Sequence, residues 1–334
     1  MKLAVAAVVV TASLFSMGCP NQAVNDSKTS LAAGNKAIGK KEYDTAIVEC
    51  KKAVEKWKEN HSAHWCLGVA YAQRAEWPAA VEAFNSTVQY APEQAMYQMW
   101  LGISQYEKAV QGAREEQARK ENKKPQEVRP DLTAVNFEKP LQHLVEAVKL
   151  NDGMWRAHYN LGRVYREMDK PKEAAAAFSK AIAGNPREWA PYVALAELYR
   201  KWDYSDQAIK VAEQGAVNVV GQNEKSGIFY VLGMGYDDKR QDKQAIEAFT
   251  KALEASRDNH AAKFQRGQAY FRQNDYMNAK RDFEEFSKSG GASLEFAKQQ
   301  ASKMLMDIAV KTAPPGEAPT EKPSPEDMVK KGKK

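Results

Sequence analysis

Residues 155–188 read WRAHYNLGRVYREMDKPKEAAAAFSKAIAGNPRE, and they carry the clearest pattern in this 334-residue chain. Small, aromatic and aliphatic residues occupy fixed places in this segment, at Leu161, Gly162, Tyr165, Ala174, Phe178, Ala181 and Pro186. The glycine place recurs elsewhere, because Gly34, Gly68 and Gly102 follow one another at intervals of 34 residues. Self-similarity at a fixed period of this length predicts a repeat protein.

The period and the residue order resemble the tetratricopeptide repeat. Further copies carry the same order, with Leu67, Gly68, Tyr71, Ala80 and Phe84 in one, and Leu232, Gly233, Tyr236, Ala245 and Phe249 in another. We expect seven repeats, at 27–60, 61–94, 95–154, 155–188, 189–225, 226–259 and 260–293. The resemblance implies an all-α fold, a right-handed α-solenoid of about seven helix pairs with a C-terminal capping helix.

The physical role of each repeat position follows from close packing between two antiparallel helices. Glycine or alanine lets the first helix (helix A) approach the second (helix B), and leucine, tyrosine and phenylalanine fill the space between them. One repeat cannot bury its apolar face alone, so neighbouring repeats stack and share a core. Residues 294–311 carry an apolar stripe on one helical face, which predicts the capping helix that closes the array.

Two segments interrupt the period. The third repeat holds an insertion at about 107–136, in which residues 113–124 read AREEQARKENKK. We expect this polar segment to extend helix A into solvent until Pro125 and Pro130 stop it, with helix B resuming near Phe137. Residues 312–334 are rich in Pro, Glu and Lys, and this composition predicts a disordered tail.

The N-terminus has the order of a secretory signal, expected at 1–18: a positive start, an apolar run at 3–15, and then Gly18 and Cys19. A run of 13 residues is shorter than the roughly 20 needed to span a bilayer. Its end resembles the lipobox of bacterial lipoproteins, which implies that Cys19 is lipidated, with palmitate among its acyl chains, and that residues 19–26 form a tether. A plain signal peptide or an uncleaved anchor is the alternative.

The remaining composition excludes several kinds of chemistry. The net charge of +6, from 49 basic and 43 acidic residues, is too mild to imply nucleic acid. The chain contains no glycine-rich phosphate loop, no His-Glu-x-x-His and no paired-cysteine metal motif. His158 occupies the same repeat position as His64, and His260 the same position as His61, so we expect all four to be ordinary helix-start residues. We therefore expect no catalytic residue, no metal and no cofactor.

Cys50 and Cys66 are the other cysteines. They fall on adjacent helices, and in an oxidising compartment such a pair is a disulfide candidate. Their repeat positions do not clearly face each other, so two separate buried thiols is the preferred interpretation and a disulfide is the alternative.

The resemblance implies a binding groove lined by the A helices, with side chains at repeat positions 2, 5, 9 and 12 pointing into it. The first zone of these positions is apolar and holds Trp65, Val69, Met96, Met99, Ile103 and Tyr106. The middle zone is basic and holds Arg156, Tyr159, Arg163, Arg166 and Arg200. The last zone is aromatic and holds Tyr230, Met234, Phe264 and Phe271.

The order of these zones predicts a protein or peptide partner with an acidic centre and apolar flanks, because arginine binds carboxylates through a planar fork. The alternative is that the arginines pair with Glu167 and Glu197 inside the protein.

These features together predict a lipid-anchored periplasmic scaffold in the bacterial envelope, with the outer membrane favoured over the inner. It resembles repeat lipoproteins such as the pilotins of type IV pilus secretins, which implies a role in assembling a pilus or secretion complex. The alternative function is an accessory activator or adaptor of a peptidoglycan or other envelope enzyme.

Overall fold

The computed structural model describes residues 20–289 and 294–313, and its regular elements there are all helical. The chain divides into two compact units, Met1–Tyr97 and Gln98–Lys334, and each is described separately. The predicted signal peptide, Cys19 and residues 314–334 of the predicted tail lie outside the described residues. Among the helices that are described, none is both long enough and apolar enough to cross a membrane.

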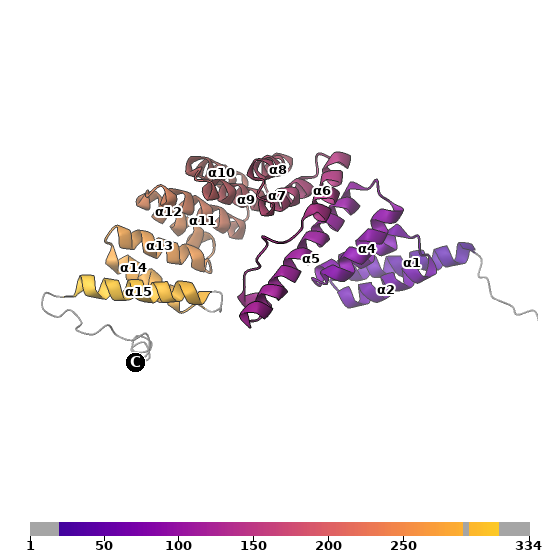
Figure 1. The fold of residues 1–334 in the computed structure, drawn as a ribbon, viewed down its shortest axis with the longest axis horizontal. Coiled ribbons are helices and arrows are strands. Elements are labelled where there is room, and N and C mark those ends of the chain that lie inside the picture. Colours follow the sequence, from indigo (N-terminus) through magenta and orange to yellow (C-terminus); the bar gives the residue numbers. More distant parts are fainter. Residues whose placement is uncertain (1–19, 290–293, 314–334) are drawn as a thin grey trace, which may run out of the picture. The chain divides into compact units, whose positions relative to one another are not determined.

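Unit 1 consists of two antiparallel helix pairs (Figure 1). They are α1 (Pro20–Gly39) with α2 (Tyr43–Lys56), and α3 (His61–Gln73) with α4 (Trp77–Tyr90). Residues 20–26, which were assigned to a tether, belong to the start of α1. Proline is well tolerated in the first turn of a helix because its missing N–H has no intrahelical partner there, so Pro20 does not prevent the helix from starting early.

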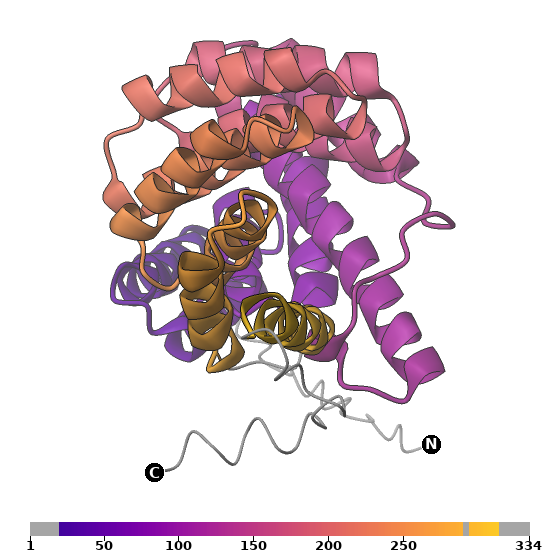
Figure 2. The ribbon, with the colours of Figure 1, turned by 90° about the vertical axis from the view of Figure 1, so that its left-hand side faces the viewer.

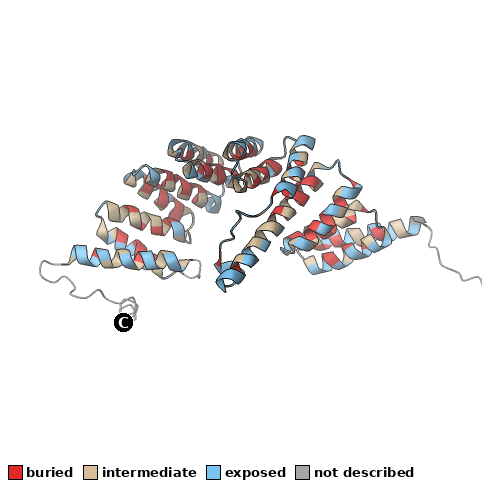
Figure 3. Cartoon of the chain, in the orientation of Figure 1, coloured by how far each residue is buried: buried red, intermediate tan, exposed pale blue. Residues whose placement is uncertain are grey.

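Unit 2 contains the remaining repeats, and α5 (Ala95–Glu121) begins just before its boundary. Its other helices are α6 (Glu138–Leu150), α7 (Trp155–Glu167), α8 (Pro171–Gly184), α9 (Trp189–Lys201), α10 (Ser205–Asn218), α11 (Gln222–Asp238), α12 (Asp242–Ala255), α13 (His260–Arg272), α14 (Tyr276–Ser287) and α15 (Glu295–Thr312). Buried residues concentrate where these helices face one another (Figure 3). Helix α15 packs on α14 and buries Ala301 and Ile308, as the capping-helix prediction required.

The repeat glycines allow a phenylalanine ring of helix B to lie directly on the backbone of helix A. A Cβ atom added at Gly162 would stand 2.6 Å from Phe178, and one added at Gly233 would stand 2.5 Å from Phe249. Both distances are shorter than real carbon contacts, so the predicted close approach of the two helices is confirmed.

The backbone conformation follows the same 34-residue period as the side chains. In six of the seven repeats a residue in the left-handed region follows helix A at the same repeat position, at Lys41, Ala75, Asp169, Asp203, Arg240 and Asn274; in the third repeat, with its longer helix, this residue is Asn122. A single left-handed residue reverses the chain within a short turn and starts helix B, so the turn geometry is shared even where its residue type is not.

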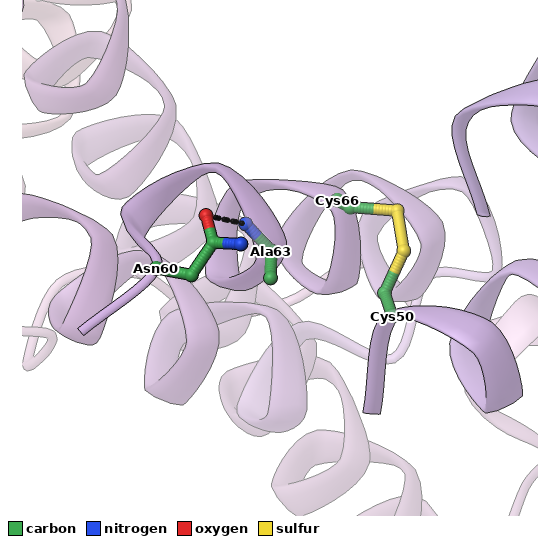
Figure 4. The surroundings of a disulfide bond; sticks show 4 residues. All are labelled: Cys50, Asn60, Ala63 and Cys66. Atoms are coloured by element: carbon green, nitrogen blue, oxygen red, sulfur yellow. Dashed lines mark hydrogen bonds between the residues drawn. A yellow bond between two sulfur atoms is a disulfide. The ribbon is translucent and has the colours of Figure 1, made fainter. Parts of the chain in front are cut away.

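The first repeat differs from the others in its core, because a disulfide takes the place of the phenylalanine of helix B. Cys50 stands at the position held by Phe84 in the second repeat, and it is bonded to Cys66 of α3 with a Cα–Cα distance of 6.0 Å (Figure 4). The preferred interpretation of two separate thiols is therefore wrong. The physical reason is Gly34: a Cβ there would collide with the Cys50 sulfur, so the glycine leaves room for the sulfurs to meet.

A set of buried hydrogen bonds connects successive repeats. The Ser27 hydroxyl donates to the Ala53 carbonyl oxygen at 2.7 Å, and the Asn60 side-chain amide donates to Ser27 Oγ at 2.9 Å. The Asn60 Oδ1 atom accepts the Ala63 N–H and caps α3 (Figure 4). The same arrangement recurs at Ser226, Ala252, Asn259 and Ala262.

The insertion in the third repeat forms a long helix and a packed return segment. Helix α5 has 27 residues, and a short 3-10 helix at Pro125–Glu127 follows it. The chain then runs back beside α5 (Figure 2). Val128 is buried, and Leu132 and Val135 pack against the cluster that contains Phe137. The extended helix and the restart near Phe137 are confirmed, but the return segment is packed rather than simply solvated.

Candidate functional site

The A helices of unit 2 place equivalent repeat positions on one face. Helix α7 contacts α9, α9 contacts α11, and α11 contacts α13. Their side chains define what we call the A-helix face, which consists of Tyr159, Arg163, Arg166, Arg200, Tyr230 and Phe271. Each of these six side chains is partly buried, so each also contributes to packing.

The aromatic side chains at repeat position 5 rest on the phenylalanine of the same repeat. The Tyr159 ring centroid lies 5.9 Å from that of Phe178, and the Tyr230 centroid lies 6.1 Å from that of Phe249. Burial raises the pKa of the Tyr159 hydroxyl, although the charges of Arg163 and Arg166 counteract it. These tyrosines are held in place by the core and keep one edge available to a partner.

Arg163 is held by a carboxylate of the insertion helix. Its Nη2 atom donates to Glu107 Oε1 at 2.9 Å, and its Nη1 atom donates to Asn160 Oδ1 at 2.9 Å. The guanidinium also lies over the Tyr106 ring, 4.4 Å from the centroid. Three different interactions therefore fix this arginine.

The two neighbouring arginines of this face are also paired within the protein. Arg166 donates to Glu167 Oε1 through Nε at 3.1 Å and Nη2 at 2.9 Å. Arg200 forms a two-pronged pair with Asp238, with donor–acceptor distances of 2.6 and 3.0 Å. The alternative interpretation, in which the arginines pair inside the protein, therefore holds for Arg166 with Glu167. Arg163 and Arg200 pair instead with Glu107 and Asp238, which the sequence interpretation did not consider.

Two further charged residues, Arg156 of α7 and Glu197 of α9, lie in the same part of the chain. Arg156 is exposed and lies over its neighbour Trp155, 4.9 Å from the ring centroid. Desolvation by neighbouring side chains raises the pKa of the Glu197 carboxyl even though the residue is exposed, and the charges of Arg166 and Arg200 counteract this rise. Crowding by neighbouring side chains desolvates a carboxylate even where a water molecule can still reach it.

Three of the predicted groove residues are almost fully buried, namely Met99, Tyr106 and Phe264. Met99 and Tyr106 belong to the cluster around Phe137, and Phe264 packs on Phe283 and Phe286. The insertion explains Tyr106, because its return segment covers that part of α5. We leave these three out of the candidate surface.

In unit 1, the apolar positions form a smaller patch. Trp65 is partly buried, with its ring centroid 4.9 Å from that of Tyr97 and 5.4 Å from that of Phe84. Met96 is 47% exposed. Both residues remain on the surface of this unit, as expected for residues that contact a partner.

A cleft in unit 2 was missed by sequence reasoning. Its volume is about 820 Å³, and one side is lined by Pro130–Thr133 and Val135–Glu138, at the end of the insertion and the start of α6. The other side is formed by Arg166, Glu167, Met168 and Asp169 at the end of α7, together with Lys201 of α9. The excess length of the third repeat was the only signal in the sequence, and it did not show where the return segment would lie.

The described residues contain no group of three or more His, Cys, Asp or Glu side chains that could hold a metal ion. Two of the histidines, His64 and His158, make local contacts with the backbone. His158 Nε2 lies 2.8 Å from the Asp152 carbonyl oxygen, and His64 Nε2 lies 2.8 Å from that of Lys58, so the two equivalent histidines interact with equivalent backbone positions.

Comparison with known families identifies the repeats directly. One tetratricopeptide repeat model matches residues 155–187, and another matches residues 31–95 and 230–288. These matches and the antiparallel helix pairs agree that the chain contains tetratricopeptide repeats. Proteins of this fold act as scaffolds for protein–protein interaction.

Among curated proteins, the chain is 35% identical over 85 residues to mouse Superkiller complex protein 3. That match covers 25% of this chain and only 5% of the mouse protein. The human protein of the same name is 33% identical over 82 residues, again 5% of its length. The likeness therefore concerns a few repeats.

Solved structures show the same architecture. PilF of Pseudomonas aeruginosa aligns with a TM-score of 0.52 and 19% identity, covering 73% of this chain and 96% of that one. A tetratricopeptide repeat protein from Parabacteroides merdae aligns with a TM-score of 0.56 and 14% identity, covering 84% and 99%. At these identities the likeness concerns the fold alone.

Proposed function

We propose that this protein is a lipid-anchored scaffold on the periplasmic side of a bacterial membrane, preferably the outer one. It holds partner proteins on the A-helix face and catalyses no reaction. Assembly of a pilus or secretion complex is the proposed setting. Its support is the resemblance to pilotin-type repeat lipoproteins in the lipid signal and the repeats, together with the fold shared with PilF.

The observation that carries the binding role is the combination of half-buried aromatic rings with exchangeable ion pairs on one face. Tyr159, Tyr230 and Phe271 are held by the core, so ordering them on binding costs little conformational entropy. Such pre-organised aromatic residues supply much of the energy at protein interfaces. Because Arg163, Arg166 and Arg200 already have carboxylate partners, a suitable ligand presents charges of both signs rather than an acidic centre alone.

The disulfide supports the proposed compartment. Disulfides persist in the periplasm and other oxidising environments and are rare in the reducing cytosol. The start of α1 at Pro20 adds a spatial consequence, because a lipid on Cys19 would be attached directly to a helix end. Residues 20–26 rise about 10 Å as a helix, so unit 1 would stand close to the bilayer surface.

The partner is tested by crosslinking and affinity capture from detergent-solubilised envelope of the native host. The double variant Tyr159→Ala, Tyr230→Ala should lose the captured partner. The matched control is Val145→Ala, Met277→Ala, which removes exposed apolar groups from the B helices α6 and α14. Equal capture by both variants and the wild type refutes the A-helix face as the binding surface.

The identity of the captured protein separates the two functions that we consider. Secretin or other barrel subunits support envelope assembly, whereas a transpeptidase or hydrolase supports the accessory role toward an envelope enzyme. The anchor is tested separately by metabolic labelling with a palmitate analogue. Cys19→Ser should abolish the label, and equal labelling of the variant contradicts lipidation at this residue.

A further inference from the structure

The cleft beside the insertion has a chemical character that differs from the A-helix face. Asp131, Glu138 and Asp169 are exposed carboxylates of its rim. The Thr133 hydroxyl and N–H donate to Asp131 Oδ1 at 2.7 and 3.0 Å, and these hydrogen bonds lower the pKa of that carboxyl. Lys201 is exposed on the same rim.

Counting all the charged residues that line the cleft gives four carboxylates against two cations, and one of these carboxylates, Glu167, already pairs with the cation Arg166. The cleft therefore carries an excess of negative charge. Its apolar part is provided by Leu132, Val135 and Met168, each of them partly buried. A short segment that places apolar side chains next to several cations would complement both properties.

The chain itself contains such a segment. Residues 328–334 read MVKKGKK, an apolar pair followed by four lysines within five residues. These residues follow α15, which belongs to unit 2, as does the cleft. The fourteen residues from 314 to 327 that connect α15 to this segment can span at most about 50 Å.

We propose that the cleft docks residues 328–334 of the same molecule. Met328 and Val329 pack on Leu132, Val135 and Met168, and the lysines face the exposed carboxylates of the rim. Tethering is the reason for choosing the same molecule over a second copy, because docking of a linked segment is an intramolecular event. This inference does not depend on the proposed partner, although the cleft shares Arg166 with the A-helix face.

The proposal is tested in the full chain with the photo-crosslinker p-benzoylphenylalanine incorporated at Val329. Mass spectrometry should find crosslinks to residues 130–138 and 166–169. The same probe incorporated at Thr320, outside the docking segment, should give few crosslinks there. Crosslinks from Val329 that are spread over other surfaces, or equal yields at the cleft from both positions, overturn the proposal.

Charge reversal tests the chemistry of recognition. The triple variant Asp131→Lys, Glu138→Lys, Asp169→Lys should lower the crosslink yield about tenfold, because the rim would then repel the lysines of the docked segment. The matched control reverses three exposed acids elsewhere in unit 2, namely Glu254, Asp258 and Asp307. Circular dichroism confirms that the variants remain folded. An unchanged yield in the rim variant overturns the proposal.

The reciprocal variant Lys330→Glu, Lys331→Glu leaves the described helices untouched and should lower the yield in the same way. Mixing isotopically heavy and light chains before irradiation identifies the source of the docked segment. Crosslinks within a single isotope class support docking in the same molecule. A large fraction of mixed crosslinks assigns the segment to a second copy and contradicts the proposal as stated.

Discussion

Removal of the Cys50–Cys66 disulfide should destabilise unit 1 without unfolding unit 2. The bridge closes a loop between residues 16 apart in the sequence. The chain-entropy relation for a loop of this length gives about 3 kcal/mol of stabilisation. Both sulfurs are also fully buried beside Gly34, so the variant Cys50→Ala, Cys66→Ala loses packing in the same place.

Hydrogen exchange measured by mass spectrometry is the appropriate assay, because it reports local opening separately in each helix. A loss of about 3 kcal/mol corresponds to roughly a hundredfold increase in the opening equilibrium. Peptides from α1, α2 and α3 should exchange faster by about this factor, while peptides from α11 to α13 serve as the internal reference. Unchanged exchange in α1 to α3 would refute the reasoning.

A second double variant separates the effect of the disulfide bond from the effect of the volume that its side chains fill. Phenylalanine stands at the Cys50 position in four other repeats, as Phe84, Phe178, Phe249 and Phe283. The variant Cys50→Phe, Cys66→Ala places a ring over Gly34 and should recover part of the lost protection even under reducing conditions. Exchange as fast as in the double alanine variant would show that the first repeat is not built around the same space as the others.

Three further changes test the packing and electrostatics of unit 2. Gly162→Leu should lower the free energy of unfolding by about 1–3 kcal/mol, because even a Cβ atom would stand 2.6 Å from Phe178; an unchanged thermal midpoint contradicts the described register. Asp282 is fully buried and forms a two-pronged pair with Arg266 at 2.7 and 2.8 Å. Asp282→Ala should lower the free energy of unfolding in urea by about 3–5 kcal/mol, because the Arg266 cation loses its carboxylate partner. The double variant Arg266→Met, Asp282→Leu should recover most of this lost stability. Desolvation raises the pKa of the Glu197 carboxyl in the folded protein. The folded state therefore favours the protonated carboxyl, and the free energy of unfolding falls as pH rises through the folded-state pKa. Glu197→Gln should therefore raise the melting midpoint at pH 7, and this advantage should disappear below about pH 4; a constant difference at all pH values would rule out the carboxylate as its cause.

The repeat architecture was accessible from sequence because it depends on contacts that are close along the chain. Each helix pair is specified by its own glycine, aromatic and alanine positions, so Gly162 and Phe178 predict the same contact wherever the period recurs. The insertion helix was also predictable, since residues 113–124 have no apolar face and prolines follow them. The start of α1 was misplaced, because the sequence that precedes the first repeat contains no helix-breaking residue after Pro20.

The site was less predictable because its properties depend on which side chains meet across repeats. The repeat positions assigned Tyr159, Arg163 and Tyr230 to the first helix of their repeats, and the structure has them on α7 and α11. They did not show that Glu107, 56 residues away from Arg163, would neutralise it, nor that the return segment would cover Tyr106. Sequence patterns record the face on which a residue lies, whereas ion pairing depends on the rotamers and separations of several helices at once.

The sequence by itself therefore determined the number, order and internal packing of the helix pairs, because a period of 34 residues repeats the same short-range contacts. Only the tertiary structure decided that Cys50 and Cys66 meet over Gly34, that the arginines are paired, and that the insertion creates a cleft. These outcomes arise between elements whose relative placement is set by the packing of whole helices, and a difference of a few ångströms there separates a bond or an ion pair from none.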